Sequence, residues 1–227
     1  MSLHKSPVVT DLSKQTLVTL RTLGTSKEAN PGSLKNYEAL GGYAQFKRIV
    51  TEKVKATDII TEVKVSGLRG RGGAAFPAGI KWRTVLNAAG PQKYIVCNAD
   101  EGDSGTFSDR MTMEGDPFML IEGMVIAGIA VGATHGYVYI RSEYPHAIAV
   151  MNEAIQLATE AGYLGHDICG SGKTFTLEVR KAAGSYVCGE ETALLESIEG
   201  KRGVVRAKPP LPALEGLFGL PTVINNV

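Results

Sequence analysis

Apolar residues recur along most of this chain at spacings typical of two kinds of element. Apolar positions three and four residues apart predict helices over residues 37–54, 57–65, 80–89, 117–131, 144–161 and 190–198. Short apolar or alternating runs predict strands at 94–97, 137–140 and 174–180. Strands that alternate with helices form a mostly parallel sheet covered on both faces. The pattern therefore predicts an α/β fold: a Rossmann-like sheet preceded by a short helical segment and a glycine-rich loop.

Both ends of the chain depart from this pattern. Residues 1–36 are polar with scattered Gly, Pro and Ser, which predicts an extended arm before an α/β domain at 37–227. From Arg206 onward Pro and Gly are frequent, so we expect an ordered loop that wraps the surface. The final residues, 222–227, are apolar and carry no helix or polar tail, which we interpret as a cut inside a longer protein.

The loop at residues 67–81 is the strongest chemical signal in the sequence. Five glycines there alternate with Arg69, Arg71 and Lys81. Glycine lets the backbone take positive φ and bring its N–H groups close to a ligand, and the cations favour an anion. No Asp or Glu occurs between residues 63 and 99, whereas six basic residues do. This segment is typical of a phosphate-binding loop.

Other interpretations of the glycines remain open from the residues alone. A glycine-rich loop is often only a turn, and the Arg-Gly pattern is similar to disordered RNA-binding segments. The single short copy and the apolar flank at 74–76 argue against the RNA-binding interpretation. The loop also fails the dinucleotide fingerprint, because a helix rather than a strand is predicted before it. A second glycine segment, 170–174, lacks the first glycine of a P-loop and leads into a strand, so we predict a turn there.

Composition restricts the partners and the compartment. The formal net charge of +1 gives no general attraction to nucleic acid or to anionic lipid, so neither is expected as a partner. The three cysteines, Cys97, Cys169 and Cys188, are far apart and form no Cys-x-x-Cys pair. That spacing argues against a disulfide framework and a metal site, and it favours a reducing cytoplasm.

No segment of the sequence is typical of a membrane span or a signal peptide. The most apolar run, residues 118–133, is shorter than the ~20 residues that cross a bilayer. It also contains Glu122, so we predict a buried helix and no direct membrane span. The first residues contain no apolar run that could direct secretion.

Five segments taken together resemble a known family. These segments are residues 67–82, 98–101, 186–192, 208–210 and 224–227. In this order they resemble the FMN-binding, NADH-oxidising subunit of respiratory complex I, the 51 kDa type. Within that family, 98–107 and 141–146 are most similar to the β (diaphorase) subunits of soluble NAD-linked formate dehydrogenases and hydrogenases, and we favour a formate dehydrogenase.

The resemblance implies that FMN is bound and that NADH stacks on the flavin. It places near the FMN phosphate and ribityl chain Gly70, Arg71, Gly72, Gly73 and Lys81, with Asn225 and Asn226 as a closing pair. It places beside the flavin Asn98, Asp100 and Glu101. Without the resemblance, the acidic pair at 100–101 would be interpreted as a turn at the end of a strand.

The resemblance also implies residues that contact the nicotinamide nucleotide. Tyr186, Gly189, Glu190 and Glu191 match positions that contact flavin and nucleotide, and the two glutamates are the predicted catalytic residues because they would orient the nicotinamide ring. The predicted substrate-binding residues are Phe76, Asp103, Glu191 and Lys208. The alternatives are a core phenylalanine for Phe76 and, for the glutamates, the first turn of a helix, where carboxylates are favoured.

The chain departs from the family pattern at three positions. Asp103 replaces a glutamate, Thr84 a second adenine-stacking phenylalanine, and Leu211 an aromatic residue. These changes affect the expected geometry of NADH binding more than that of FMN binding. The family's four-iron four-sulfur cluster is expected only in a full-length protein, beyond Val227.

Two functions follow as alternatives. The first is a diaphorase module that passes electrons between NAD(H) and FMN, with iron–sulfur subunits of a multisubunit dehydrogenase as partners. The second is a non-catalytic nucleotide-binding or assembly fragment of such a complex. A phosphate site for some other nucleotide is a further possibility.

Overall fold

A computed structural model of the chain describes residues 33–227. Most of the predicted arm, residues 1–32, lies outside the described residues. The first helix, α1 (Leu34–Ala39), begins inside the stretch predicted as arm, because the Ser33 hydroxyl caps it by accepting a hydrogen bond from the Asn36 amide at 3.2 Å.

The single helix predicted over 37–54 is wrong, because the structure contains two helices there. α1 ends before Gly41, which has φ of +87°, and α2 (Ala44–Thr51) follows a short turn. A side chain on Gly42 would place its Cβ 2.2 Å from the ring of Tyr37. The turn therefore depends on glycine at two successive positions.

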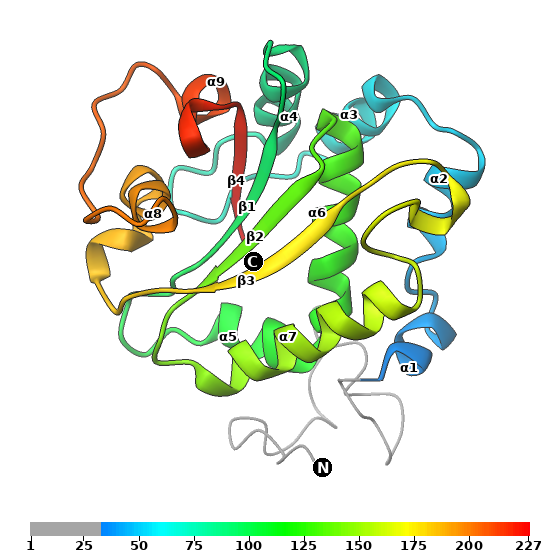
Figure 1. The fold of residues 1–227 in the computed structure, drawn as a ribbon, viewed down its shortest axis with the longest axis horizontal. Helices are drawn as coiled ribbons and strands as arrows, with labels where there is room; N and C mark the ends of the chain where they lie inside the picture. Colours follow the sequence, from blue (N-terminus) through cyan, green and yellow to red (C-terminus); the bar gives the residue numbers. More distant parts are fainter. Residues whose placement is uncertain (1–32) are drawn as a thin grey trace.

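A four-stranded parallel sheet forms the centre of the molecule (Figure 1). Its strands are β1 (Tyr94–Ala99), β2 (His135–Ile140), β3 (Thr176–Lys181) and β4 (Thr222–Asn226), in the order β3-β2-β1-β4. All three pairings are parallel, which confirms the predicted sheet. β1 lies between β2 and β4, and Asn98 on β1 is in register with Asn226 on β4.

β4 corrects the expectation that the chain after Arg206 is only a surface loop. The β-branched residues Thr222, Val223 and Ile224 are buried and pair with β1. Two short helices, α9 (Pro212–Glu215) and the 3₁₀ helix η4 (Leu217–Gly219), precede this strand. The Pro and Gly residues belong to the turns between these elements. Because they dominate the composition of this segment, the sequence analysis did not predict the strand.

Helices cover both faces of the sheet, as predicted. α6 (Pro117–Val131) and α7 (Pro145–Glu160) pack on the face that carries Ile95, Cys97 and Val138. On the opposite face α8 (Glu191–Ile198) packs its Leu194 and Leu195 against β1, β2 and β4. Figure 1 shows the sheet between α6 and α8.

α6 has the bounds that the sequence predicted, and its environment explains its uniform hydrophobicity. It is buried between the sheet and the helices that precede the glycine loop. Glu122, its one acidic residue, accepts hydrogen bonds from the Tyr37 hydroxyl at 2.5 Å and from the Tyr43 amide at 2.8 Å. The carboxylate thus joins α6 to the N-terminal helices.

The remaining helices frame the loops at the edge of the sheet. They are α3 (Ala56–Val65), α4 (Ala78–Asn87), α5 (Ser108–Gly115), and the 3₁₀ helices η2 (Ile168–Gly170) and η3 (Tyr186–Gly189). The glycine segment at 170–174 is a turn that leads into β3, as predicted, and the Gly172 amide donates to the Asp167 carboxylate at 2.7 Å. The sequence analysis missed α5.

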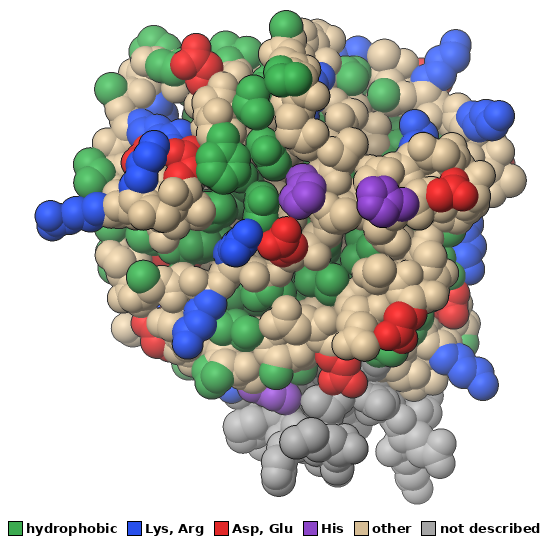
Figure 2. Space-filling view, in the orientation of Figure 1, with side chains coloured by type: hydrophobic (Ala, Val, Ile, Leu, Met, Phe, Trp, Pro, Cys, Tyr) green, Lys and Arg blue, Asp and Glu red, His purple; other side chains and the backbone are tan. Residues whose placement is uncertain are grey.

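The described residues contain no helix that is both long and apolar enough to cross a membrane. The three cysteines are free, and two of them, Cys97 and Cys188, are buried. On the face seen in Figure 2, acidic and basic side chains are interspersed with hydrophobic ones. This mixture agrees with the small net charge of the chain.

Candidate functional site

The glycine loop is a tight hairpin between α3 and α4. Its base is closed by two hydrogen bonds, from the Gly70 amide to the Phe76 carbonyl and from the Ala78 amide to the Leu68 carbonyl, each 2.9 Å long. At its tip Gly73 has φ of +95°, a conformation that side-chain-bearing residues rarely adopt. Within residues 33–227, the backbone amides of 71–76 donate to no protein acceptor. The tip therefore presents free donors, as an anion site requires.

The end of β4 lies directly against this hairpin. A Cβ on Gly72 would approach the Asn226 side-chain oxygen to 3.0 Å. Asn226 also donates to the Asn98 carbonyl at 3.5 Å, and the Asn98 amide group donates to the Gly189 carbonyl at 2.8 Å. A chain of asparagines thus connects the glycine loop to the segment that precedes α8.

Lys81 places a positive charge on the same side of the sheet. It projects from α4, and its Nζ donates to the Ile224 carbonyl at 2.5 Å. Burial lowers the pKa of Lys81, and the charge of Lys208 acts in the same direction, whereas Glu191 raises it. One turn of α4 is further fixed by Trp82, whose indole N–H donates to Asn225 at 3.3 Å.

The N-terminus of α8 brings two carboxylates to the site. Glu190 caps this helix, since one oxygen accepts from the amides of Thr192 at 2.8 Å and Ala193 at 2.9 Å. Lys208 donates to Glu190 at 3.0 Å and to Glu191 at 2.6 Å. Burial raises the pKa of Glu190, but the hydrogen bonds from Thr192, Ala193 and Lys208 outweigh it, so that pKa lies below its ordinary value.

A cavity of about 440 Å³ joins the hairpin, the strand ends and the α8 N-terminus. Its size is in the range of small-molecule and cofactor sites. The predicted site residues that line it are Gly70, Gly72, Phe76, Lys81, Asn98, Gly189, Glu190, Glu191, Lys208, Asn225 and Asn226. Thr84 and Leu211, two of the departures from the family pattern, line the same cavity.

Six predicted site residues do not line this cavity: Arg71, Gly73, Asp100, Glu101, Asp103 and Tyr186. Glu101 is buried, and its carboxylate accepts from the Ser108 hydroxyl and from the Asp109 amide, both at 3.0 Å. It also accepts from the Tyr144 hydroxyl at 3.1 Å. These contacts make Glu101 the group that holds the start of α5.

Asp103 and Tyr186 contact each other outside the cavity. The Tyr186 hydroxyl donates to the Asp103 carboxylate at 3.0 Å, and the Tyr186 ring lies over Gly102, where a Cβ would come within 2.8 Å of it. Asp100 is half-buried, and burial raises its pKa to about 6, with Glu143 acting in the same direction and Arg141 opposing it. This group of residues lies at the carboxyl end of β1, next to Gly189, whose Cβ position is 3.4 Å from the Asp100 carbonyl.

Arg71 lines a second cavity of about 310 Å³ beneath the hairpin. This cavity shares Gly70, Asn225 and Asn226 with the first one. Its remaining wall is mostly apolar and comes from α6, β1 and β4. The hairpin is therefore open on both sides, with polar groups on the α8 side and apolar groups on the α6 side.

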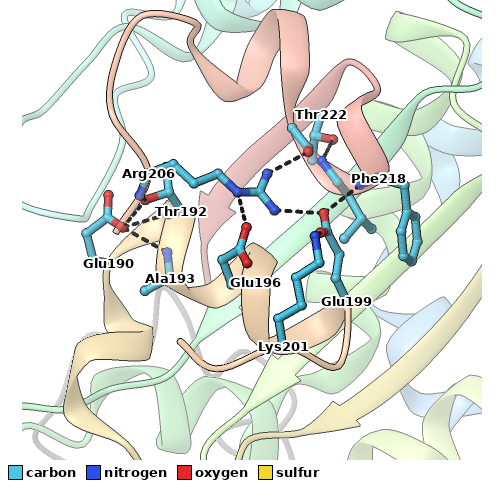
Figure 3. A network of polar contacts seen from close by, with 11 residues as sticks. Glu190, Thr192, Ala193, Glu196, Glu199, Lys201, Arg206, Phe218 and Thr222 are labelled. Atoms are coloured by element: carbon cyan, nitrogen blue, oxygen red, sulfur yellow. Dashed lines mark hydrogen bonds and ion pairs between the residues drawn. The ribbon is translucent and has the colours of Figure 1, made fainter. Parts of the chain in front are cut away.

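Sequence reasoning missed a second polar cluster behind the α8 carboxylates. Arg206 binds the carboxylates of Glu196 on α8 and of Glu199, the residue that follows this helix (Figure 3). The sequence did contain a signal, since Glu196 lies on the helix predicted at 190–198, Glu199 follows it directly, and Arg206 is two residues before Lys208. The Ile224 carbonyl, which accepts from Lys81, has no such signal because any residue supplies a carbonyl group.

The donor set of the cavity fits FMN together with a nicotinamide nucleotide. Free amides and the half-buried Lys81 suit a phosphate at the hairpin end. Carboxylates at the α8 end suit hydroxyl and amide donors of a nucleotide. Among the described residues, no group of three or more His, Cys, Asp or Glu side chains is placed to hold a metal ion.

Comparison with known proteins decides the family. The model of the Nuo51 FMN-binding domain of the complex I 51 kDa subunit matches residues 63–227. The chain belongs to this family. The match includes the glycine loop, the strand ends and the α8 N-terminus, and it confirms the resemblance found in the sequence.

Relatives of the Nuo51 family agree along most of the chain. An NADH-quinone oxidoreductase subunit of Rhizobium meliloti is 55% identical over 194 residues, which are 86% of this chain and 46% of that protein. NADP-reducing hydrogenase subunit HndC of Solidesulfovibrio fructosivorans is 52% identical over 198 residues, 87% of this chain and 40% of that protein. The chain therefore spans less than half the length of these two relatives.

A solved structure confirms the fold. The crystal structure of an NAD⁺-reducing [NiFe]-hydrogenase in the H₂-reduced state superimposes with a TM-score of 0.70 at 42% sequence identity. The superposition covers 76% of this chain and 29% of the hydrogenase chain. The α/β architecture predicted from the hydrophobic pattern is thus found in a protein of related sequence.

Proposed function

We propose that this chain is the FMN- and NADH-binding module of a multisubunit oxidoreductase. The observation that carries the proposal is the shared cavity, in which the free amides of the hairpin lie opposite Glu190, Glu191 and Lys208. Membership of the Nuo51 family supports FMN as the ligand of the hairpin. The relatives whose names include NADH and NADP support a nicotinamide nucleotide as the second ligand.

The hairpin would hold the phosphate of FMN. The amides of residues 71–76 would donate to the phosphate oxygens, and Lys81 would contribute a positive charge from the base of the cavity. Gly72 and Gly73 keep the approach free of side chains. Asn225 and Asn226, held at the end of β4, would orient the ribityl chain beside the loop.

The α8 end of the cavity would hold the nicotinamide nucleotide. Glu190 and Glu191 are acceptors for the carboxamide and ribose hydroxyls, and Lys208 is a donor for the pyrophosphate. Phe76 is 50% exposed and lines the cavity, so its ring is free to stack on the adenine. Bound FMN supplies the hydride acceptor, and the protein orients the two rings without a general base.

Within the family, we also propose which kind of enzyme contains this chain. We infer a soluble NAD-linked formate dehydrogenase in the cytoplasm, in which iron–sulfur subunits exchange electrons with this module. The residues 98–107 and 141–146 support this inference by their similarity to diaphorase β subunits. Isolation of the tagged native complex tests it, because formate-dependent reduction of NAD⁺ is expected and hydrogen- or quinone-linked activity would contradict it.

The flavin proposal is tested by the optical spectrum of the purified chain. After incubation with FMN and gel filtration, flavin absorbance bands are expected to elute with the protein, and anaerobic NADH should bleach them. A colourless protein would contradict the assignment. ATP that displaces FMN in a thermal-shift assay would instead favour a general nucleotide site.

Retention of FMN without bleaching by NADH would support the second candidate function, a non-catalytic nucleotide-binding or assembly fragment. The dissociation constant of NADH, measured by quenching of flavin fluorescence, separates a chain that binds NADH without reacting from one that does not bind it.

A further inference from the structure

Arg206 forms the centre of a polar cluster between α8 and the segment that leads into η4. Its guanidinium donates to Glu196 at 2.5 Å, to Glu199 at 2.8 Å and to the Gly216 carbonyl at 2.9 Å (Figure 3). One side chain thus joins α8 to the segment between α9 and η4. Glu199 is only 5% exposed and also accepts from the Phe218 amide at 2.7 Å.

The backbone of Arg206 extends this cluster to the cavity. Its amide donates to the Thr192 hydroxyl at 2.9 Å, and that hydroxyl donates to Glu190 at 2.5 Å. Lys208, two residues further along the chain, donates to the other oxygen of Glu190 and to Glu191. Arg206 is therefore linked to Glu190 through the Thr192 hydroxyl and to Lys208 through two residues of backbone.

We propose that Arg206 is the positioning residue for nucleotide recognition at this site: its bonds to Glu196, Glu199 and Gly216 hold Lys208 against Glu190 and Glu191. The inference rests on the proposed function for the identity of the nucleotide. It concerns the α8 end of the cavity, because the hydrogen bonds of Arg206 in the described part of the chain go to Thr192, Glu196, Glu199 and Gly216 and none goes to residues 67–81. FMN binding is therefore expected to be independent of Arg206.

The geometry requires an arginine. Three acceptors on two elements surround one side chain, and only a planar guanidinium presents donors to all of them in a fixed arrangement. A lysine would keep the positive charge but would lose the planar arrangement of N–H donors. Without the guanidinium contacts, the segment between Arg206 and Lys208 would keep the bond from the Arg206 amide to Thr192 and the bonds of Lys208 to the two glutamates, so Lys208 would be held less firmly.

The test compares Arg206→Gln and Arg206→Lys with Lys201→Ala. Lys201 is a suitable control because it binds the same Glu199 at 2.8 Å from a side chain that is 61% exposed. In FMN-loaded protein, we expect Arg206→Gln to raise the KM for NADH roughly tenfold with little change in kcat. The dissociation constant of FMN should stay within twofold of the wild-type value, Arg206→Lys should be intermediate, and Lys201→Ala should behave as wild type.

A second measurement does not depend on turnover. Lysine side chains labelled by reductive ¹³C-methylation give separate NMR signals, and Lys208→Arg assigns the signal of Lys208. Burial lowers the pKa of Lys208, but Glu191 and Glu190 together outweigh it, so its signal titrates above the ordinary range. In Arg206→Gln we expect this titration to move toward that of a free lysine, whereas Lys201→Ala should leave it in place.

The outcomes separate this inference from the proposed function. An unchanged Lys208 titration and an unchanged NADH KM in folded Arg206→Gln would overturn the positioning role. If Arg206→Gln does not fold, Glu196→Ala, which removes one of the three acceptors of the guanidinium, decides by the same two measurements. A wild-type chain that binds no FMN would refute the proposed function, and the Lys208 titration would still test the role of Arg206.

Discussion

Gly72 lies so close to Asn226 that a Cβ on the glycine would be 3.0 Å from the asparagine side-chain oxygen. These residues are far apart in the sequence, one in the hairpin after α3 and the other at the end of the last strand. Their contact fixes the distance between the free amides of the hairpin and the carboxyl end of the sheet. The phosphate site therefore depends on β4 as much as on the glycines.

Replacement of Gly72 by valine is expected to abolish retention of FMN. The new side chain would displace Asn226, and its β-branch would restrict the loop at the point where the amides converge. Flavin content after gel filtration measures the effect. Ala161→Val, at an exposed position at the end of α7 and outside both cavities beside the hairpin, is the control for adding a valine. A Gly72→Val protein with full flavin content would refute the assigned loop.

Lys81→Gln is expected to weaken FMN binding at least tenfold. The substitution removes the half-buried positive charge on α4 and the ammonium group that donates to the Ile224 carbonyl. Lys64→Gln, at an exposed position of α3, removes one positive charge outside the cavity and should leave the dissociation constant unchanged. Fluorescence titration with FMN distinguishes them, and equal effects of both substitutions would indicate general electrostatics rather than a defined site.

The sequence predicted most of the fold because each covered strand and helix carries its own periodicity. α6 has the predicted bounds, and α3, α7 and α8 agree to within a residue or two. The failures have physical causes. The helix predicted over 37–54 is interrupted by Gly41 and Gly42. β4 is a short strand that forms by pairing with β1, and the composition of a segment does not indicate such a long-range contact.

The sequence predicted the site residues that belong to a motif. It did not predict the residues whose role depends on tertiary contacts. The glycines, Lys81 and the α8 glutamates line one cavity because the parallel sheet brings the strand ends together. Glu101 is adjacent to Asp100 in the sequence but turns inward to hold the start of α5. The role of Arg206 depends on Gly216 and Glu199, which only the folded chain brings to it.

The two α8 glutamates are expected to differ in their effect on stability. Glu190→Ala removes the helix cap and should lower the free energy of unfolding by about 1 kcal/mol, besides raising the KM for NADH. Glu191→Gln keeps the cap and should raise only the KM, since Glu191 contacts Lys208 and the cavity. Urea denaturation and steady-state kinetics together measure this difference. A loss of stability of the same size in both variants would contradict the assigned roles.

The carboxyl group of Asp109 is expected to make the free energy of unfolding depend on pH. Burial raises its pKa to about 7, and the charge of Glu101 acts in the same direction, whereas the Ser108 hydroxyl opposes it. The folded state therefore binds more protons than the unfolded state between about pH 4 and pH 7, so this residue lowers the free energy of unfolding as the pH rises through that window. Asp109→Asn removes the effect, and its stability relative to wild type should increase from pH 4 to pH 8 by about 1 kcal/mol. Glu153→Gln, at an exposed position of α7, controls for the loss of one negative charge. Urea denaturation at several pH values measures both variants, and parallel curves for Asp109→Asn and wild type would show that the carboxyl group ionises as easily in the folded chain as in the unfolded one.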